Sequence, residues 1–159
     1  PLLRKRAPDS ELIAQMCTHY GAPHLERLKP VDSGKCILCG LCARACAELS
    51  VGAISTVNRG VTKEVATPYH DPSPVCVGCG SCASVCPTDA IPLTETADTR
   101  TIWGKTFTLV RCARCGAVIG TAEELALAAQ KAGEEPETLC ERCRKAALAQ
   151  VLAHAYGDQ

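Results

Sequence analysis

The feature that most constrains this chain is a run of cysteines that occurs twice. Residues 36–46 have the sequence CILCGLCARAC and residues 76–86 have the sequence CVGCGSCASVC, so the spacing C-x2-C-x2-C-x3-C recurs at an offset of 40 residues. Thiols at positions i, i+3 and i+6 of a tight loop converge on one point outside the backbone. This convergence favours a shared metal centre over the pairing of the thiols with one another.

The cysteine content of the whole chain supports the same choice. The chain has 159 residues and 13 cysteines, and twelve of these cysteines lie in clusters with spacers of two or three residues. Disulfide scaffolds of secreted proteins have more varied spacings, so we expect metal ligation and not a disulfide-rich exported module. The thirteenth cysteine, Cys17, is interpreted as a small hydrophobic residue within a helix.

Both runs resemble the sequence that binds [4Fe–4S] clusters in two-cluster bacterial ferredoxins. The resemblance covers residues 31–95, about 40% of the chain, and includes Asn58–Gly60, Val65–Pro68 and the Pro-Thr pair after Cys86. More narrowly, this segment is similar to the ferredoxin domains of iron–iron hydrogenases, of the large iron–sulfur subunit of NADH dehydrogenases, and of formate-metabolising complexes. Those larger proteins also have further cluster domains and catalytic domains that this sequence lacks.

The resemblance implies two clusters that exchange one ligand each. In such ferredoxins three thiolates of one loop ligate one cluster, and the fourth cysteine of the run ligates the other cluster. We expect this fourth cysteine to begin a helix that points away from its own loop. The implied ligands are Cys36, Cys39, Cys42 and Cys86 for the first cluster, and Cys76, Cys79, Cys82 and Cys46 for the second.

The similarity between the two halves extends beyond the cysteines. Gly40 corresponds to Gly80 and Ala43 to Ala83, and small residues there suit a backbone that passes close to sulfide. After the fourth cysteine both halves continue to an Ala-Ile pair, with three more residues in the first half. We interpret the pattern as an internal duplication of two βαβ-like halves related by a pseudo-two-fold axis.

The remaining sequence predicts two hairpins and a second type of cysteine site. Residues 54–68 and 96–111 alternate apolar and polar residues around glycine-containing turns, which is typical of β-hairpins. Two cysteine pairs follow, with a predicted helix over residues 122–133 between them and another helix that begins at the second pair. The pairs form a C-x2-C…C-x2-C pattern, which is a strong metal signal, and consist of Cys112, Cys115, Cys140 and Cys143.

Three centres suit these four thiols. Zinc is the first interpretation, because Gly116 supplies the turn of a zinc knuckle and a helix N-terminus favours thiolates. A third [4Fe–4S] cluster is the second, since the layout also resembles iron–sulfur subunits of formate hydrogenlyase-type complexes and small electron-transfer subunits of tungsten aldehyde oxidoreductases and benzoyl-CoA reductases. In the latter group all clusters carry electrons. A rubredoxin-like single iron is the third interpretation.

Charge and hydropathy limit the partners. Lys plus Arg and Asp plus Glu are 17 each, so the chain has no cationic excess for nucleic acid. Basic residues near the two cysteine pairs are interpreted as compensation for the charge of about −2 that four thiolates leave around a divalent metal. No apolar run approaches the ~18 residues of a membrane span, and no signal peptide is recognisable, so we expect a cytoplasmic protein.

We therefore expect an α+β protein with three parts. These are an N-terminal docking arm without a core of its own (1–30), a two-cluster ferredoxin-like domain (31–95), and a hairpin with a metal-binding C-terminal module (96–159). No radical-SAM or nucleotide-binding motif is present, and clusters with four protein thiolates have no open iron for substrate, so we expect electron relay without catalysis.

The expected role is that of an iron–sulfur subunit in a hetero-oligomeric oxidoreductase. It would pass single electrons between a catalytic redox subunit and a ferredoxin, a flavin subunit or another redox partner, with the amphipathic ends of the chain docked on that partner. The alternative is a redox- or oxygen-sensing, or structural, iron–sulfur protein with a zinc-ribbon interaction module. Such a sensor needs a DNA-binding or enzymatic output, and the sequence shows neither.

Overall fold

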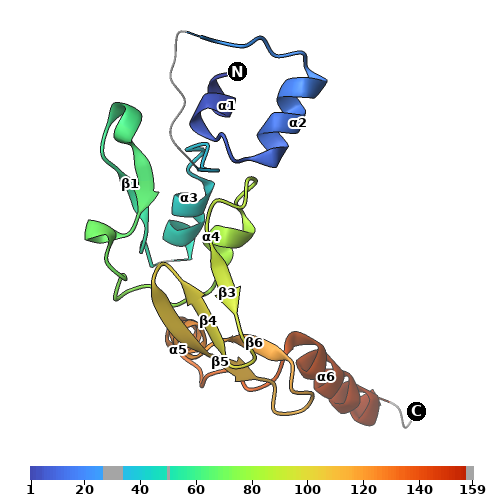
Figure 1. The fold of residues 1–159 in the computed structure, drawn as a ribbon. Helices are drawn as coiled ribbons and strands as arrows, with labels where there is room; N and C mark the ends of the chain where they lie inside the picture. Colours follow the sequence, from blue (N-terminus) through green and yellow to red (C-terminus); the bar gives the residue numbers. More distant parts are fainter. Residues whose placement is uncertain (27–33, 50, 157–159) are drawn as a thin grey trace. The chain divides into compact units, whose positions relative to one another are not determined.

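The computed structural model describes residues 1–26, 34–49 and 51–156, and mixes short helices with short strands (Figure 1). Contacts divide the chain into two units. The N-terminal unit contains Pro1–Cys76, Gly80–Leu93 and Ile102–Gly104, and the C-terminal unit contains Val77–Cys79, Thr94–Thr101 and Lys105–Gln159. The ends of the predicted arm (27–30), of the ferredoxin-like domain (31–33) and of the tail (157–159) lie outside the described residues, and the three predicted domain boundaries remain predictions.

The arm forms two helices, α1 (Leu2–Arg6) and α2 (Glu11–His19). The hydroxyl of Ser10 accepts a hydrogen bond from the backbone N–H of Ile13 at 3.4 Å, which caps α2 at its first turn. The two helices contact each other and bury Ala7, Ser10 and Ile13. The described part of the arm therefore has a small packed centre, which the sequence did not lead us to expect.

Helices α3 (Leu41–Glu48) and α4 (Ser81–Ser84) each begin directly after a glycine of a cysteine run. Gly40 and Gly80 have φ of 75° and 76°, a left-handed conformation that favours glycine. The third cysteine of each run therefore lies in the first helical turn. We expected the fourth cysteine of each run to begin a helix, and this prediction is wrong. Cys46 lies near the end of α3, and Cys86 follows the end of α4.

Residues 54–68 contain the predicted hairpin. Strand β1 (Ser55–Val57) pairs antiparallel with β2 (Glu64–Ala66), and a 3₁₀ turn, η1 (Gly60–Thr62), lies in the connection. A second 3₁₀ turn, η2 (Pro68–His70), follows β2. The βαβ form expected for each half is not found in the described residues, because no strand precedes α3 within 34–40 or α4 within 71–80.

The C-terminal sheet has the strand order β3-β4-β5-β6, from β3 (Leu93–Glu95), β4 (Thr99–Ile102), β5 (Lys105–Arg111) and β6 (Val118–Thr121). Strands β4 and β5 are joined by two residues, Trp103 and Gly104, which confirms the hairpin predicted over 96–111. Phe107 and Leu109 of β5 are buried while their neighbours Thr106 and Thr108 are exposed, as the period of a strand requires.

Two helices complete this unit. Helix α5 (Ala122–Ala132) begins with a capping box between Thr121 and Glu124 and ends at Gly133 with φ of 70°, which confirms the helix predicted over 122–133. Helix α6 (Glu141–Tyr156) begins one residue after Cys140, also as predicted. Among the described residues, none of the helices combines the length and apolar character that a membrane crossing demands.

The loop between Cys76 and Cys79 packs against the C-terminal sheet, in the same unit. The hydroxyl of Thr121 donates to the carbonyl of Val77, and the Arg100 guanidinium donates to the carbonyl of Gly78 at 2.9 Å. A Cβ atom added at Gly78 would lie 2.5 Å from the ring of Phe107. The second cysteine run therefore depends on residues of the sheet for the shape of its first loop.

We predict that Gly78→Ala lowers the melting temperature more than Gly133→Ala does. Both glycines have positive φ, so each substitution costs about 1 kcal/mol of backbone strain. Only Gly78 lacks space, and overpacking adds about 1–3 kcal/mol, whereas nothing lies within 4 Å of a Cβ at Gly133. Thermal unfolding followed by circular dichroism measures the difference, and equal losses for the two variants would contradict this account of the loop.

Candidate metal centres

Four cysteines from both runs surround one cavity in the N-terminal unit. The cavity has a volume of about 220 Å³, and its wall includes Cys36, Cys39, Cys42 and Cys86. The first three belong to one loop and the start of α3, whereas Cys86 comes from the other run. The structure thus brings together the four residues that the sequence assigns to the first cluster, and the donor set suits iron–sulfur chemistry.

Backbone N–H groups point at the sulfur atoms in both runs. The N–H of Ala90 lies 3.3 Å from the Cys86 sulfur, and the N–H of Ala53 lies 3.2 Å from the Cys46 sulfur. These alanines belong to the two Ala-Ile pairs, so corresponding residues of the two halves donate to corresponding sulfurs. The N–H of Leu38 also donates to Cys36, at 3.4 Å. Such donors stabilise thiolates and the sulfurs of bound clusters.

The two sides of the cavity differ in how readily a thiol gives up its proton. Burial raises the pKa of Cys42 above its ordinary value, and the nearby thiolates of Cys36 and Cys39 add to this effect. Burial also raises the pKa of Cys86, but the N–H groups of Ala90 and Thr88 and the Thr88 hydroxyl outweigh burial and leave that pKa below its ordinary value. A metal that binds here must therefore displace a tightly held proton from Cys42.

The residues assigned to the second cluster are partly buried on their own elements. Cys46 on α3 and Cys82 on α4 are buried, the two helices contact each other, and Cys76 and Cys79 are half-buried. The indole Nε1–H of Trp103 donates to the Cys82 sulfur at 3.4 Å. These positions fit thiolate ligands with hydrogen-bond donors around them, and the ligation of one cluster by these four residues remains a prediction.

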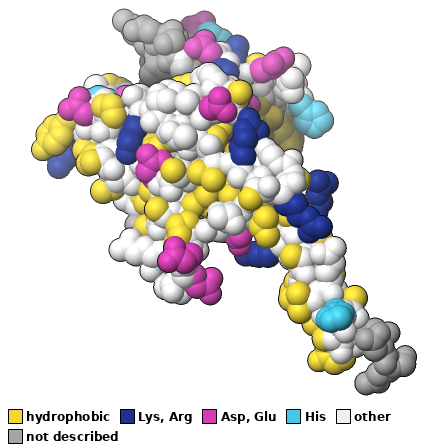
Figure 2. Space-filling view, turned by 90° about the horizontal axis from the view of Figure 1, so that it is seen from below, with side chains coloured by type: hydrophobic (Ala, Val, Ile, Leu, Met, Phe, Trp, Pro, Cys, Tyr) yellow, Lys and Arg dark blue, Asp and Glu magenta, His cyan; other side chains and the backbone are white. Residues whose placement is uncertain are grey.

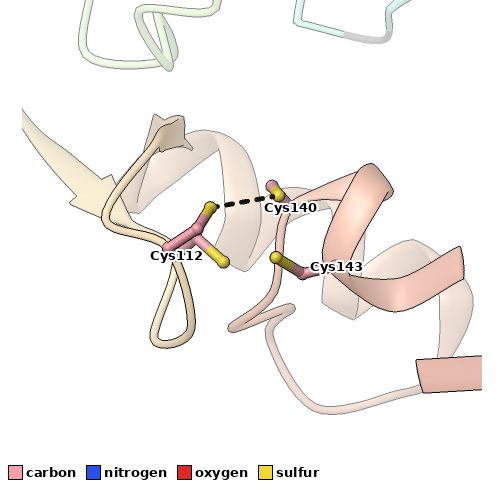
Figure 3. A group of neighbouring side chains, drawn as sticks. Cys112, Cys140 and Cys143 are labelled. Carbon is pink, nitrogen blue, oxygen red and sulfur yellow. Dashed lines mark hydrogen bonds between the residues drawn. The ribbon is translucent and has the colours of Figure 1, made fainter. Parts of the chain in front are cut away.

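The four cysteines of the C-terminal module form a compact group. The sulfur atoms of Cys112, Cys115, Cys140 and Cys143 all lie within 4.8 Å of one another, and those of Cys115 and Cys140 are 3.6 Å apart. Figure 3 shows the labelled Cys112, Cys140 and Cys143 pointing toward one another from a turn after β5 and from the start of α6. Bonds of ~2.3 Å to a tetrahedral zinc ion place thiolates about 3.8 Å apart, so the group matches the size of a single-ion site.

Backbone hydrogen bonds hold the two pairs of this group in place. The N–H of Gly116 donates to the Cys112 carbonyl at 2.9 Å, and the N–H of Cys112 donates to the Ala117 carbonyl at 2.8 Å. Gly116 has φ of 72°, the left-handed conformation that the sequence predicted for this turn. The N–H of Ala113 donates to the Thr138 carbonyl at 2.9 Å and so joins the first pair to the segment before the second.

The thiols of this group have strongly separated pKa values. The backbone N–H of Cys140, with those of Cys115 and Arg114, lowers the pKa of Cys112 to about 6. The N–H of Ala117 lowers the pKa of Cys115. Hydrogen bonding with the Cys140 sulfur, together with burial and the other thiols, raises the pKa of Cys143 to about 12. The close approach of the four sulfurs opposes their joint ionisation, and a bound cation would stabilise the thiolate forms.

The outcome for the remaining predicted features is mixed. All thirteen cysteines are free, and Cys17 lies half-buried in α2. Some basic residues of the tail pair with carboxylates: Arg144 lies 3.3 Å from Glu137, and Lys145 lies 2.5 Å from Glu141. Sequence reasoning missed Arg6 and Trp103, which both line the first cavity, because neither residue belongs to a cysteine motif.

Comparisons with known proteins identify the kind of domain that contains the two cysteine runs. Residues 35–90 match the family described as "4Fe-4S dicluster domain". The chain is 41% identical over 63 residues to the NADP-reducing hydrogenase subunit HndD of Solidesulfovibrio fructosivorans, and 37% identical over 65 residues to a putative formate dehydrogenase of Staphylococcus haemolyticus. Each match covers 38% of this chain, but only 11% and 6% of the two relatives. Residues 35–90 thus carry a ferredoxin-type iron–sulfur domain.

We predict that Cys86→Ser and Cys39→Ser perturb the same cluster, and that Cys46→Ser perturbs the other. The reason is that Cys86 lines the cavity of Cys36, Cys39 and Cys42. Electron paramagnetic resonance of the reduced, iron-loaded chain should show one altered signal for Cys86→Ser and Cys39→Ser, and a different altered signal for Cys46→Ser. Iron anomalous density that joins Cys46 and Cys36 to one cluster would contradict the exchange of ligands.

Proposed function

We propose that this chain is an electron-transfer iron–sulfur subunit of a multi-subunit oxidoreductase. The observation that carries the proposal is the cavity in which Cys86 of the second run joins Cys36, Cys39 and Cys42 of the first. Four thiols around one cavity fit a [4Fe–4S] cluster with one thiolate for each iron. In the proposed protein the other four cysteines of the two runs, Cys46, Cys76, Cys79 and Cys82, bind a second cluster. When bound, such clusters take up and release one electron each.

The chain's own residues bind and shield the clusters. The thiols supply all four ligands of each cluster, so no coordination position is left for a substrate. The backbone N–H groups of Ala53 and Ala90 donate hydrogen bonds to the sulfur atoms of the fourth cysteines, Cys46 and Cys86. The matched donors and the left-handed glycines Gly40 and Gly80 also support an origin by duplication, with the two halves related by a pseudo-two-fold axis.

We assign the C-terminal group of four cysteines to one structural zinc ion. Sulfur atoms within 4.8 Å of one another, two of them 3.6 Å apart, need to move by only about 1 Å to reach the spacing of a tetrahedral ion. A [4Fe–4S] cube separates its four thiolates more widely, because the cube itself lies between them. The zinc ion holds the turn after β5 to the start of α6 and has no redox chemistry of its own.

The relatives suggest the kind of complex. The matched proteins are named as a subunit of an NADP-reducing hydrogenase and as a putative formate dehydrogenase. The matches cover the ferredoxin-type segment of this chain. In the proposed complex a catalytic redox subunit supplies the chemistry, and a ferredoxin or a flavin subunit is the second redox partner.

Helix α6 offers a surface for such a partner. Leu148, Val151, Leu152 and Tyr156 follow the i, i+3, i+4 and i+8 positions of one helix face, and they are between 49% and 73% exposed. Figure 2 shows apolar side chains gathered along the helix that leads to the C-terminus. These exposed apolar side chains suit a protein interaction site.

We predict that the tagged chain, purified without oxygen from its native host, carries a second redox protein. The double variant Leu148→Glu with Val151→Glu should lose that protein while its iron content stays unchanged, because charges on the apolar face cannot be desolvated. Gln150→Glu adds charge on the opposite face of α6 and should retain the partner. Substrate of the captured complex should reduce the clusters. Recovery of the chain alone, or of a DNA-bound chain, would contradict the proposed function.

We predict about eight irons, about eight sulfides and one zinc per chain after anaerobic purification. Cys140→Ser should lose the zinc and release α6 from the turn after β5, because structural zinc sites contribute folding free energy directly. The iron should stay bound, because the sheet residues that support the second cysteine run, Arg100, Phe107 and Thr121, lie outside the zinc site. Metal analysis with circular dichroism measures both effects, and Cys17→Ser is the control for thiol loss. About twelve irons with matching sulfide and no zinc would show a third cluster in place of the zinc ion.

A further inference from the structure

Trp103 occupies a strained position at the turn between β4 and β5. Trp103 and Gly104 have φ of 52° and 71°, as in the tight turns that favour Asn-Gly. Glycine suits the second position, but positive φ is an outlier for a bulky residue such as tryptophan. Strained backbone persists only where the surroundings fix it, and it is concentrated at functional sites.

The indole of Trp103 connects both sets of cysteines. Its Nε1–H donates to the sulfur of Cys82, which belongs to the second ligand set, at 3.4 Å. The same residue lines the cavity of the first set, whose wall also includes Cys42 and Cys86. All of these residues belong to the N-terminal unit. The turn therefore places an N–H donor on a sulfur of one ligand set and brings the same residue to the cavity of the other.

Arg6 is the corresponding polar group at the first set. Its terminal nitrogens donate to the carbonyls of Val61, at 3.3 Å, and Lys63, at 2.5 Å, which fixes the guanidinium. Its Nε is buried, lacks a hydrogen-bond partner, and belongs to a residue that lines the cavity. A buried donor without a partner is costly, and an anionic cluster in the cavity would lower that cost.

We infer that Trp103 and Arg6 set the reduction potentials of the two clusters separately, Trp103 for the cluster bound by Cys82 and Arg6 for the cluster in the cavity. The inference rests on the proposed function. Reduction adds one negative charge to a cluster, so a fixed N–H donor or cation stabilises the reduced form more than the oxidised form and raises the potential. Both are positioning residues, because neither ligates a cluster.

The test is a redox titration of the iron-loaded full chain, followed by electron paramagnetic resonance. Cys39→Ser and Cys79→Ser assign each signal to its cluster. The chain has a single tryptophan, so growth with benzothienylalanine replaces only the Trp103 indole and exchanges its N–H for sulfur with little change of shape. The signal altered by Cys79→Ser is called the Cys79 signal, and the signal altered by Cys39→Ser is called the Cys39 signal. In the benzothienylalanine sample we expect a lower reduction potential for the Cys79 signal and an unchanged reduction potential for the Cys39 signal. Trp103→Phe is the genetic counterpart.

Arg6 is tested in the same titration. Arg6→Gln removes the cation and should lower only the reduction potential of the Cys39 signal. Arg6→Lys keeps the positive charge and should leave that reduction potential close to the value of the unmodified chain. Unchanged potentials in the tryptophan and Arg6→Gln samples, or shifts of both signals together, would overturn the inference. An unmodified chain without two reversible signals would instead refute the proposed electron relay. Failure of the inference about Trp103 and Arg6 is therefore distinguishable from failure of the proposed function.

Discussion

The constraint on which the rest of this structure depends is the convergence of thiols. Thiolates repel one another, so the backbone must bring the thiols together and donate hydrogen bonds to the sulfurs that a metal then binds as thiolates. In the ferredoxin-type segment Gly40 and Gly80 reverse the chain and start a helix, so that the third cysteine of each run lies in its first turn. In the tail Gly116 and the start of α6 solve the same problem for pairs of cysteines.

Much of this arrangement could be predicted, because its causes are local. Spacing alone indicated the three groups of cysteines, and turn glycines with apolar alternation indicated both hairpins and α5. The position of the fourth cysteine was predicted wrongly for a physical reason. The helix begins immediately after the left-handed glycine, so the fourth cysteine comes about one turn later, near or beyond the helix end. The predicted βαβ form of each half is also not found, because residues 34–40 and 71–80, which precede α3 and α4, contain no strand.

The groups around the ligands could not be predicted, because long-range contacts bring them to the sites. Arg6 lies 30 residues before Cys36, and Trp103 lies 21 residues after Cys82. Neither has a local pattern that separates it from a surface arginine or a core tryptophan. A tryptophan followed by glycine between two predicted strands was the available signal, since a turn with positive φ is an unusual place for an indole.

The loop of the second cysteine run is supported by residues that lie beyond the family match, which ends at residue 90. Residues 77–79 of the second run belong to the C-terminal unit, where Arg100 and Thr121 donate to the carbonyls of Gly78 and Val77. Phe107, 1% exposed, fills the space that Gly78 leaves open. A chain with few large aromatic residues thus uses its one phenylalanine to support a ligand loop. The tail sheet is therefore a structural part of the second cysteine run, and removing it would leave Cys76 and Cys79 on a loop with unpaired backbone carbonyls.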